Sequence, residues 1–379
     1  MMCARRKYCN IEKETNMTKK KKIGLLNLPV DNNYGGHLQR YALMEVMRSD
    51  SIDVIHLNCR PLNSRKSIYK LVKFFIIELI RFIKGLLKGK YSLYDVLYLK
   101  YLLRRDPKTE RFYETYVKHT GRIYTKKELA SYLDFDSYLV GSDQVWRAKM
   151  ANYQYGIDTY FFDYLPNTKS RYAYGVSLGT QNGEYTDEEI MRLSSMYRAF
   201  KMVSVREEQS IDTFQQCGWN EPAAIPVLDP TMLLDKEHYS NLVTKVYTKK
   251  SSGNMFCYVL DENEDKQLKI EQIAKDKRLI PFYISLKTNC SVEQWLRSFM
   301  DAEFVVTDSY HGLVFSLIFN KPFYLLYNKQ RGNARFESLL NRFCIKGDEP
   351  VYNWNIINTL MQKERERAFG YIKNMCESL

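Results

Sequence analysis

The sequence predicts an α/β fold in which two halves meet at a cleft, and three observations lead to this fold class. The chain has 379 residues, and at roughly 100–200 residues per domain this length suggests two or three domains. Strand-like and helix-like spacings alternate from residue 23 onward, and strand–helix–strand order implies parallel sheets. The composition, 45% hydrophobic and 27% charged, excludes a disordered chain, a collagen-like fibre and a disulfide-stapled miniprotein.

The first half begins with a βαβ unit. An apolar run follows four lysines, a turn with paired glycines comes next, and helical spacing of apolar side chains leads to a second apolar run. The same alternation resumes beyond residue 119. We expect strands at 23–28, 52–57, 137–141, 171–177 and 202–205, and helices at 37–48, 126–133 and 186–200.

A second series of strands and helices follows. Its expected strands are 223–228, 255–260, 279–285, 304–307 and 323–327, and its expected helices are near 206–216, 235–246, 263–277, 291–300, 311–319, 333–343 and 354–375. No linker marks a boundary. We therefore expect a basic, disordered leader at 1–22, an N-terminal domain at 23–205 with an insert at 65–119, a C-terminal domain at 206–350, and a last helix within 351–379 that crosses back to the first half.

The net charge of +13 is concentrated in two places. Residues 1–22 carry +6 and residues 65–105 carry +9, so the rest of the chain nets −2. The second segment reads as a basic amphipathic helix, which either packs on the core with a solvated lysine face or contacts an anionic membrane surface. A nucleic-acid channel through the body is not expected. Residues 1–16 differ from the rest, and Met17 would make a more natural start.

The eight cysteines form no CxxC and no cluster with zinc spacing. Reduced thiols in a cytoplasm are the simple interpretation, and we expect no metal. No signal-type apolar stretch precedes Ile23. The longest uncharged run within 71–87 has four residues, which is too short to span a bilayer. We therefore expect a cytoplasmic protein, peripheral at the inner membrane face if the basic segment binds lipid.

Two unusual stretches follow expected strands of the first half, where open α/β sheets bind ligands. In the first, 32–39, paired glycines let backbone N–H groups approach an anion, although a plain βα turn is equally open and a dinucleotide fingerprint is absent. In the second, 141–146, Asp143 and Gln144 stand at the sheet edge and Trp146 is a platform for a sugar ring. The alternative is a helix cap with the tryptophan in the core.

Two further stretches have the same position. Arg206 ends a strand in 203–207, where its guanidinium suits phosphate or carboxylate, unless it forms a structural pair with Glu207. His311 stands at a helix start in 305–312, flanked by small donors, where a neutral imidazole and bound anions are favoured. A purely structural histidine is the alternative.

Together these stretches and the triplet 229–231 (Asp-Pro-Thr) resemble the polysaccharide pyruvyl transferase family over most of residues 23–345. The resemblance implies two Rossmann-like halves in a glycosyltransferase-B-like arrangement. It also implies transfer of the enolpyruvyl carbons of phosphoenolpyruvate to a sugar, giving a pyruvate ketal in a cell-surface glycan. Phosphoenolpyruvate would be a co-substrate, and no cofactor is expected. This chemistry calls for an acid, a base and an anion clamp.

From the resemblance we assign roles to individual residues. The expected catalytic residues are His311 and Asp143, the expected donor-binding residues are Arg206, Gly35, Gly36, Ser309, Tyr310, Arg331 and Arg335, and the expected acceptor-binding residues are Gln144, Trp146 and Asn33. In one departure, some family members carry Arg-Leu immediately before the His-Gly, where this chain has Ser309 and Tyr310. Another arginine would have to balance the donor's charge.

The expected reaction is pyruvyl transfer to a polyprenyl-linked saccharide in capsule or exopolysaccharide biosynthesis. Its main alternative is a sugar-nucleotide-dependent glycosyltransferase of similar fold, which would need a nucleotide-sized pocket in the second half. A third hypothesis is an idle scaffold in a glycan assembly complex. A nucleic-acid binder ranks last, because no aromatic-basic interleaving occurs in the body.

Overall fold

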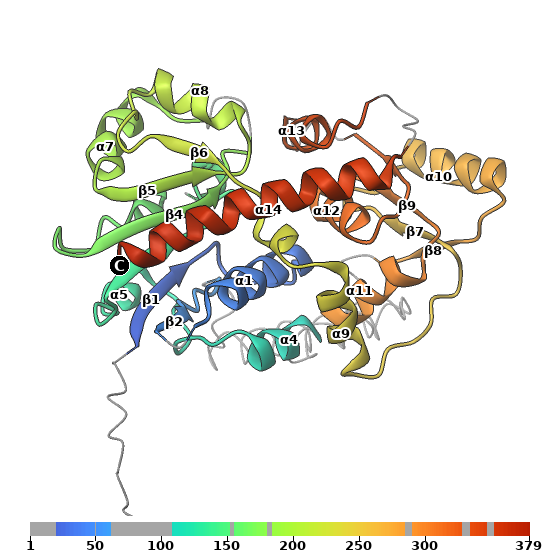
Figure 1. The fold of residues 1–379 in the computed structure, drawn as a ribbon, viewed down its shortest axis with the longest axis horizontal. Helices are drawn as coiled ribbons and strands as arrows, with labels where there is room; N and C mark the ends of the chain where they lie inside the picture. Colours follow the sequence, from blue (N-terminus) through green and yellow to red (C-terminus); the bar gives the residue numbers. More distant parts are fainter. Residues whose placement is uncertain are drawn as a thin grey trace, which may run out of the picture.

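A computed structural model describes residues 20–49, 51–61, 108–151, 155–179, 184–284, 290–327, 334–346 and 352–379. The predicted leader, apart from its last three residues, and the basic segment 65–105 lie outside these residues. The α/β class with two parallel Rossmann-like halves is confirmed, because the strands form two separate sheets and every strand pair is parallel (Figure 1).

The first sheet has the strand order β2-β1-β3-β4-β5-β6. Its central strands are buried along most of their length, as parallel strands covered on both faces require. The strands are β1 (Lys21–Leu26), β2 (Ile52–His56), β3 (Ser137–Val140), β4 (Ser170–Val176), β5 (Phe200–Val205) and β6 (Ala224–Pro226). The accompanying helices are α1 (Tyr34–Met47), α4 (Lys108–Tyr116), α5 (Lys126–Leu129), α6 (Ala148–Ala151), η2 (Ile157–Phe161), α7 (Asp187–Tyr197) and α8 (Gln209–Gln216).

The assignment of β6 to the second series was wrong. This strand pairs with β5 through Val203–Ala224, Ser204–Ile225 and Val205–Pro226, so it closes the edge of the first sheet. The preceding helix, α8, connects these two neighbouring strands and therefore also belongs to the first half. An apolar strand pattern does not state which neighbour the strand pairs with, and with no linker the sequence offered no other signal.

The second sheet has the order β10-β9-β7-β8. Its strands are β7 (Met255–Tyr258), β8 (Pro281–Tyr283), β9 (Phe304–Thr307) and β10 (Phe323–Leu325). Its helices, together with those that connect it to the first sheet, are η3 (Pro230–Leu233), α9 (Lys236–Thr244), α10 (Glu264–Lys277), α11 (Val292–Asp301), α12 (Tyr310–Ile318) and α13 (Ala334–Arg342). Most of these helices begin with a side-chain cap, as at Asp235, Asn263, Ser291 and Ser309.

The two halves share one hydrophobic core across their junction. Tyr34, at the start of α1, stacks on Trp295 of α11 with ring centroids 5.6 Å apart. The largest buried cluster contains side chains of α1, α4, η3, α9, α11 and α12. The first turn of α1 is therefore held against the second half by packing, which places two helix starts, of α1 and α12, beside each other.

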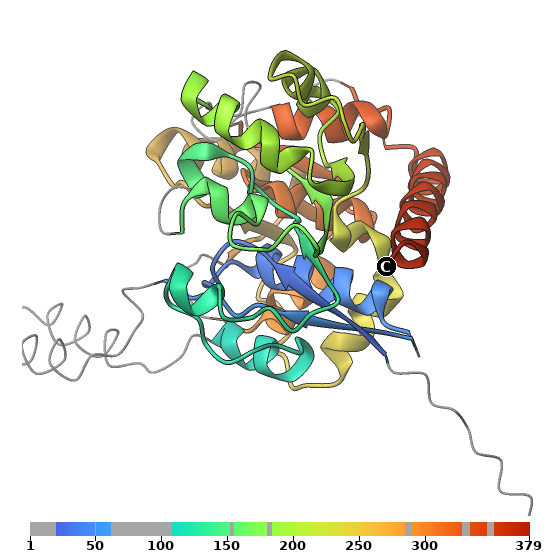
Figure 2. The ribbon, with the colours of Figure 1, turned by 90° about the vertical axis from the view of Figure 1, so that its left-hand side faces the viewer.

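The last helix, α14 (Trp354–Glu377), runs along one side of both halves (Figures 1 and 2). Near its start, the Tyr352 hydroxyl donates to the carbonyl of Phe323 in β10 at 2.6 Å. Near its end, the Tyr371 hydroxyl donates to the carbonyl of Ala173 in β4 at 3.0 Å. The helix thus crosses back from the second sheet to the first. None of the helices among the described residues is long and apolar enough to cross a membrane.

Candidate functional site

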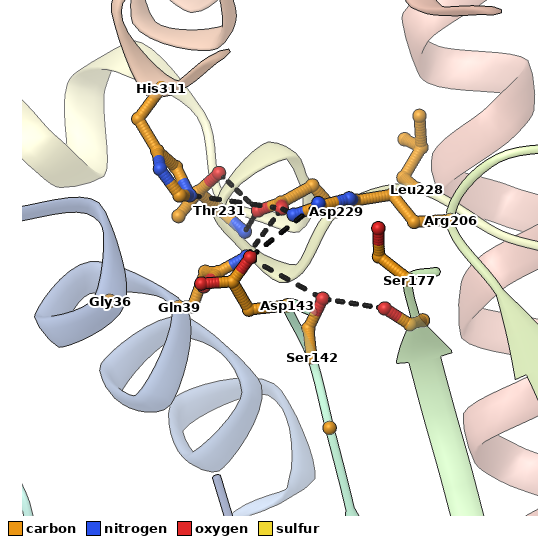
Figure 3. A network of polar contacts seen from close by, with 12 residues as sticks. Gly36, Gln39, Ser142, Asp143, Ser177, Arg206, Leu228, Asp229, Thr231 and His311 are labelled. Carbon is orange, nitrogen blue, oxygen red and sulfur yellow. Dashed lines mark hydrogen bonds and ion pairs between the residues drawn. The ribbon is translucent and has the colours of Figure 1, made fainter. Parts of the chain in front are cut away.

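Side chains from both halves meet where the strands end, at the junction of the two sheets (Figure 3). Arg206 follows β5, Asp229 follows β6, and Asp143 lies three residues beyond β3. His311 is in the first turn of α12, and Gln39 is in the second turn of α1. Four of these five side chains come from the first half, and His311 reaches them from the second.

Asp229 is the centre of this group. Its carboxylate is buried. Oδ1 accepts two hydrogen bonds from Thr231, one from the backbone nitrogen at 3.0 Å and one from Oγ1 at 2.6 Å. Oδ2 accepts from Gln39 Nε2 at 2.6 Å and from Arg206 Nη1 at 3.0 Å, and lies 3.9 Å from His311 Nε2. Burial alone would raise the pKa of Asp229, but the His311 and Arg206 charges and the Thr231 hydrogen bonds lower it overall. The carboxylate is therefore ionised at neutral pH.

Arg206 lies between three carboxylates. Its Nε donates to Glu207 Oε1 at 2.7 Å, its Nη1 donates to Asp229, and its Nη2 is 3.6 Å from Asp143 Oδ1. The guanidinium also covers the Tyr310 ring, with Cζ 4.3 Å from the ring centroid. Burial would lower the pKa of Arg206, but the Glu207 carboxylate and its other neighbours raise it well above its ordinary value. Nη2 has no hydrogen-bond partner among the described residues, so one donor remains for a ligand.

His311 is held in a narrow space between the two halves. A Cβ added at Gly35 of α1 would lie 2.0 Å from its Nδ1 and 2.2 Å from its Cγ, so only glycine allows this approach. The side chain is buried, and Nε2 has no hydrogen-bond partner within the described part of the chain. Burial lowers the pKa of His311, and the Asp229 and Asp143 carboxylates oppose this only in part. The imidazole is therefore neutral at neutral pH.

A second group of cations stands near Tyr310. Arg335 and Arg342, both from α13, line a narrow cleft together with Arg206, Glu207, Asp229 and Tyr310. Arg335 Cζ lies 5.7 Å from the Tyr310 ring centroid, so two guanidinium groups contact the same ring. Three guanidinium groups and two carboxylates line this cleft, so its net positive charge would attract a compact anion with several charged oxygens.

Asp143 is positioned by an unusual backbone. It has a positive φ of 77°, and its carbonyl accepts from the backbone nitrogens of Val145 at 2.8 Å and of Ser177 at 2.9 Å. Its carboxylate is 19% exposed, more than that of Asp229. Ser142, beside it, is buried and donates to the Gly175 carbonyl at 2.7 Å. The 141–143 turn therefore directs one partly open carboxylate into the site.

Several predicted residues are used differently or lie elsewhere. Trp146 is fully buried, donates its indole N–H to the Tyr160 carbonyl at 2.9 Å and stacks on Phe161 with centroids 4.4 Å apart. It therefore cannot stack on a sugar, and the predicted platform is replaced by the core packing that was the alternative. Gln144 accepts a hydrogen bond from Arg147 Nη1 at 3.0 Å. This contact does not involve the group around Asp229.

One residue predicted to bind the acceptor, Asn33, and one predicted to bind the donor, Ser309, are helix caps. Asn33 Oδ1 accepts from the Gly36 backbone nitrogen at 3.2 Å, so this N–H is already bonded. Ser309 Oγ accepts from the Gly312 backbone nitrogen at 3.4 Å and caps α12 in the same way. These caps fix the helix starts that bring Gly35 against the His311 ring. Arg331 lies outside the described residues.

Three residues of this site were not predicted from the sequence. Gln39 lies in the unusual stretch 32–39 and Asp229 in the triplet 229–231, but their local sequence predicts no role for them. The Asp229 carboxylate and the Gln39 amide come together only when α1 and η3 pack against each other. Arg342 ends the amphipathic helix α13, and the residues beside it in the sequence form no motif that predicts a functional site. Its Nη1 donates to the Val227 carbonyl at 3.0 Å and fixes α13 over the site. The described residues contain no cluster of His, Cys, Asp or Glu that could hold a metal.

A family model described as polysaccharide pyruvyl transferase matches residues 33–330. This range includes every residue of the central cluster and confirms the resemblance. No curated protein matches the chain. Among solved structures, the chain is similar to a putative UDP-N-acetylglucosamine 2-epimerase from Listeria monocytogenes, with 10% identity, a TM-score of 0.49, and coverage of 95% of this chain and 98% of that one. It is also similar to S. aureus MnaA bound to UDP (11% identity, TM-score 0.46, coverage 93% and 90%) and to the wall teichoic acid polymerase TagF (9%, 0.43, 94% and 83%).

Proposed function

The chain belongs to the polysaccharide pyruvyl transferase family, and we propose that it transfers the enolpyruvyl carbons of phosphoenolpyruvate to two hydroxyls of a saccharide, forming a pyruvate ketal. The observation that carries this proposal is the junction of Arg206, Asp229 and His311, beside a narrow cleft that Arg335 and Arg342 also line. Phosphoenolpyruvate is a small molecule with a phosphate and a carboxylate. Guanidinium groups recognise both by paired hydrogen bonds.

The proposed reaction has two additions at C2 of phosphoenolpyruvate. A proton joins the methylene carbon C3, which makes C2 electrophilic, and the first acceptor hydroxyl bonds to C2. The bond between C2 and the phosphate oxygen then breaks, phosphate leaves with its electron pair, and the second hydroxyl bonds to C2. Of the two hydroxyl protons, one replaces the proton given to C3 and the other leaves with phosphate, so the step is balanced without an oxidant or reductant.

His311 is proposed to give a proton to C3 and to be reprotonated with a proton from an acceptor hydroxyl. It is neutral in the ligand-free protein because burial lowers its pKa. A bound anionic donor adds negative charge beside the ring and favours the imidazolium, so donor binding and protonation are coupled. Asp143, the more open carboxylate of the site, is proposed to take the proton of the acceptor hydroxyl. Asp229 then acts as the fixed carboxylate that positions Arg206.

Arg206 and Arg335 are proposed to bind the donor's charge. Both contact the ring of Tyr310, the residue after the position where some relatives carry arginine. The charge that the local sequence lacks would thus come from the residue after β5 and from α13. The acceptor is proposed to be a polyprenyl-linked saccharide of a capsule or exopolysaccharide, met at the cytoplasmic face of the membrane.

One observation favours the glycosyltransferase alternative. A cavity of about 560 Å³ lies at the carboxyl ends of β7 and β8, lined by Val259, Ile270, Tyr283 and Lys266 among others. Its volume is within the usual range of small-molecule sites. However, Glu262 and Glu264 also line it, and Lys266 Nζ is bonded to Asp308 Oδ2 at 2.6 Å. The two glutamates would repel the diphosphate of a sugar nucleotide, and Lys266 is already paired. The alternative therefore ranks second.

The test is a thermal and calorimetric titration with phosphoenolpyruvate, beside UDP- and GDP-sugars. The proteins are the wild type, His311→Ala, Arg206→Ala and, as a control, Arg192→Ala, which changes an exposed ion pair with Asp158. At a donor concentration of 100 times Kd, binding should stabilise the wild type and the control by about 2.7 kcal/mol. We expect His311→Ala and Arg206→Ala to lose most of this shift. A response to nucleotide sugars alone would replace the proposal with the glycosyltransferase.

A further inference from the structure

Arg40 of α1 carries a buried positive charge that the Asp31 and Asp143 carboxylates favour only from a distance. The residue is only 3% exposed. Its Nη2 donates to the Leu28 carbonyl at 2.7 Å. Among the described residues, Nε and Nη1 have no hydrogen-bond partner, and no carboxylate lies within 4.0 Å of the guanidinium. A buried charge whose donors are unsatisfied is costly to the folded state. Such a group needs a physical explanation.

The surroundings of Arg40 increase this cost. A Cβ added at Gly36 would lie 3.2 Å from Arg40 Nη1, so the guanidinium lies against the first turn of α1. That turn carries the positive end of a 14-residue helix and contains no acidic residue. His37, in the same turn, is neutral, since burial and then the Arg40 charge lower its pKa to about 3. Two positive features thus face each other, and no carboxylate of the described residues is bonded to the guanidinium.

This position is close to the proposed catalytic histidine. The atom nearest to a Cβ added at Gly35 is His311 Nδ1. The atom nearest to a Cβ added at the next residue, Gly36, is Arg40 Nη1. Because consecutive Cα atoms are about 3.8 Å apart, the two nitrogen atoms are separated by roughly 12 Å at most. With about 3 Å for a hydrogen bond at each end, a ligand of roughly 6 Å or less would span them. A three-carbon molecule with two anionic groups has this size.

We propose that Arg40 and the first turn of α1 form a second anion subsite, which binds a carboxylate or phosphate group of the substrate. The inference rests on the proposed function for its ligand: the cleft beside Arg206 and Arg335 would hold one anionic group of phosphoenolpyruvate, and Arg40 would hold the other. The subsite would thus select donors with two anionic groups and align C3 with His311.

The test compares Arg40→Gln with Arg365→Gln. Arg365 donates to the carbonyls of Met232 and Leu234 at 2.6 and 2.9 Å, so it is a partly buried arginine with a structural role. Each protein is titrated by calorimetry with phosphoenolpyruvate, pyruvate and inorganic phosphate, and its thermal unfolding is measured without ligand. Arg40→Lys is added as a variant that keeps the charge but not the planar fork.

We expect Arg40→Gln to weaken phosphoenolpyruvate binding by roughly 10- to 100-fold. The ligand-free variant should be as stable as the wild type or more stable, because an unsatisfied charge is removed. Arg365→Gln should show the reverse, with lower stability and donor affinity within about twofold. Loss of pyruvate binding in Arg40→Gln would assign the carboxylate to the subsite, and loss of phosphate binding would assign the phosphate.

Unchanged affinity of Arg40→Gln for all three ligands, with reduced stability, would overturn the inference and make Arg40 structural. This result is distinct from failure of the proposed function. If the wild type does not bind phosphoenolpyruvate, inorganic phosphate still probes the subsite: a phosphate response that depends on Arg40 supports the subsite, and a response independent of Arg40, or none, contradicts it.

Discussion

Replacing Gly35 by alanine should displace the His311 ring and weaken donor binding. The added methyl carbon would lie 2.0 Å from Nδ1 and 2.5 Å from Cε1. An ordinary contact needs about 3.5 Å or more, so the imidazole must move by about 1.5 Å. A lost hydrogen bond to a charged ligand costs about 1.5–3 kcal/mol. This corresponds to a roughly 10- to 150-fold higher Kd for phosphoenolpyruvate. Overpacking of about 1–3 kcal/mol is partly offset by a gain in helix propensity of about 1 kcal/mol.

The assay is calorimetric titration with phosphoenolpyruvate, together with denaturant unfolding of the ligand-free protein. Gly370→Ala is the matched control, because this glycine also lies in a helix and nothing stands within 4 Å of the added Cβ. The control should gain about 1 kcal/mol of stability and keep its donor affinity. Donor affinity of Gly35→Ala equal to that of the wild type would refute the reasoning, since it would show that the ring does not contact the donor from this position.

Three other changes test the buried charges. Asp229→Asn should lower the free energy of unfolding by about 3–5 kcal/mol in denaturant titration, since it removes an ionic partner of buried Arg206; a loss below about 1 kcal/mol would contradict its central role. The folded-state pKa of His37, about 3, lies below its unfolded value, so stability present at neutral pH is lost as pH falls below about 6.5. Between pH 7 and 5 this loss is about 2 kcal/mol, and His37→Asn should remove that part of the pH dependence. Tyr310→Phe should leave the free energy of unfolding nearly unchanged. Tyr310→Leu should lower it by about 2 kcal/mol more, because the ring under Arg206 is lost. Equal free energies of unfolding for the two variants would exclude a stabilising cation–π contact.

The fold class and the region of the site could be predicted because they depend on local patterns. Parallel strands end at one edge of a sheet, so Asp143 and Arg206, each a few residues beyond an apolar run, had to lie near each other. The pairing of β6 could not be predicted in the same way. Its three residues carry no signal that separates the edge of the first sheet from the start of the second.

The roles of individual side chains depended on contacts that are distant in the sequence. Trp146 was predicted at the surface of the site, but its neighbours include Phe161 and Phe214, which the chain brings around it only after folding. Gly35 was expected to expose its backbone N–H to an anion. The structure adds a steric reason, because the ring that it accommodates belongs to a residue 276 positions later. A glycine in a sequence shows that space is needed, without showing which atom fills it.

The distribution of charge in the site follows one physical rule. Asp229 and Glu207 hold Arg206 by hydrogen bonds within the fold, so its geometry is fixed before any ligand arrives. Arg40 has no such carboxylate partner among the described residues. Preorganised charges stabilise a transition state without reorganisation, whereas an unbalanced cation supplies affinity for the missing anion. A protein that binds a doubly anionic donor needs both kinds of cation. The first orients the reacting atoms, and the second makes the complete site more stable with the donor than without it.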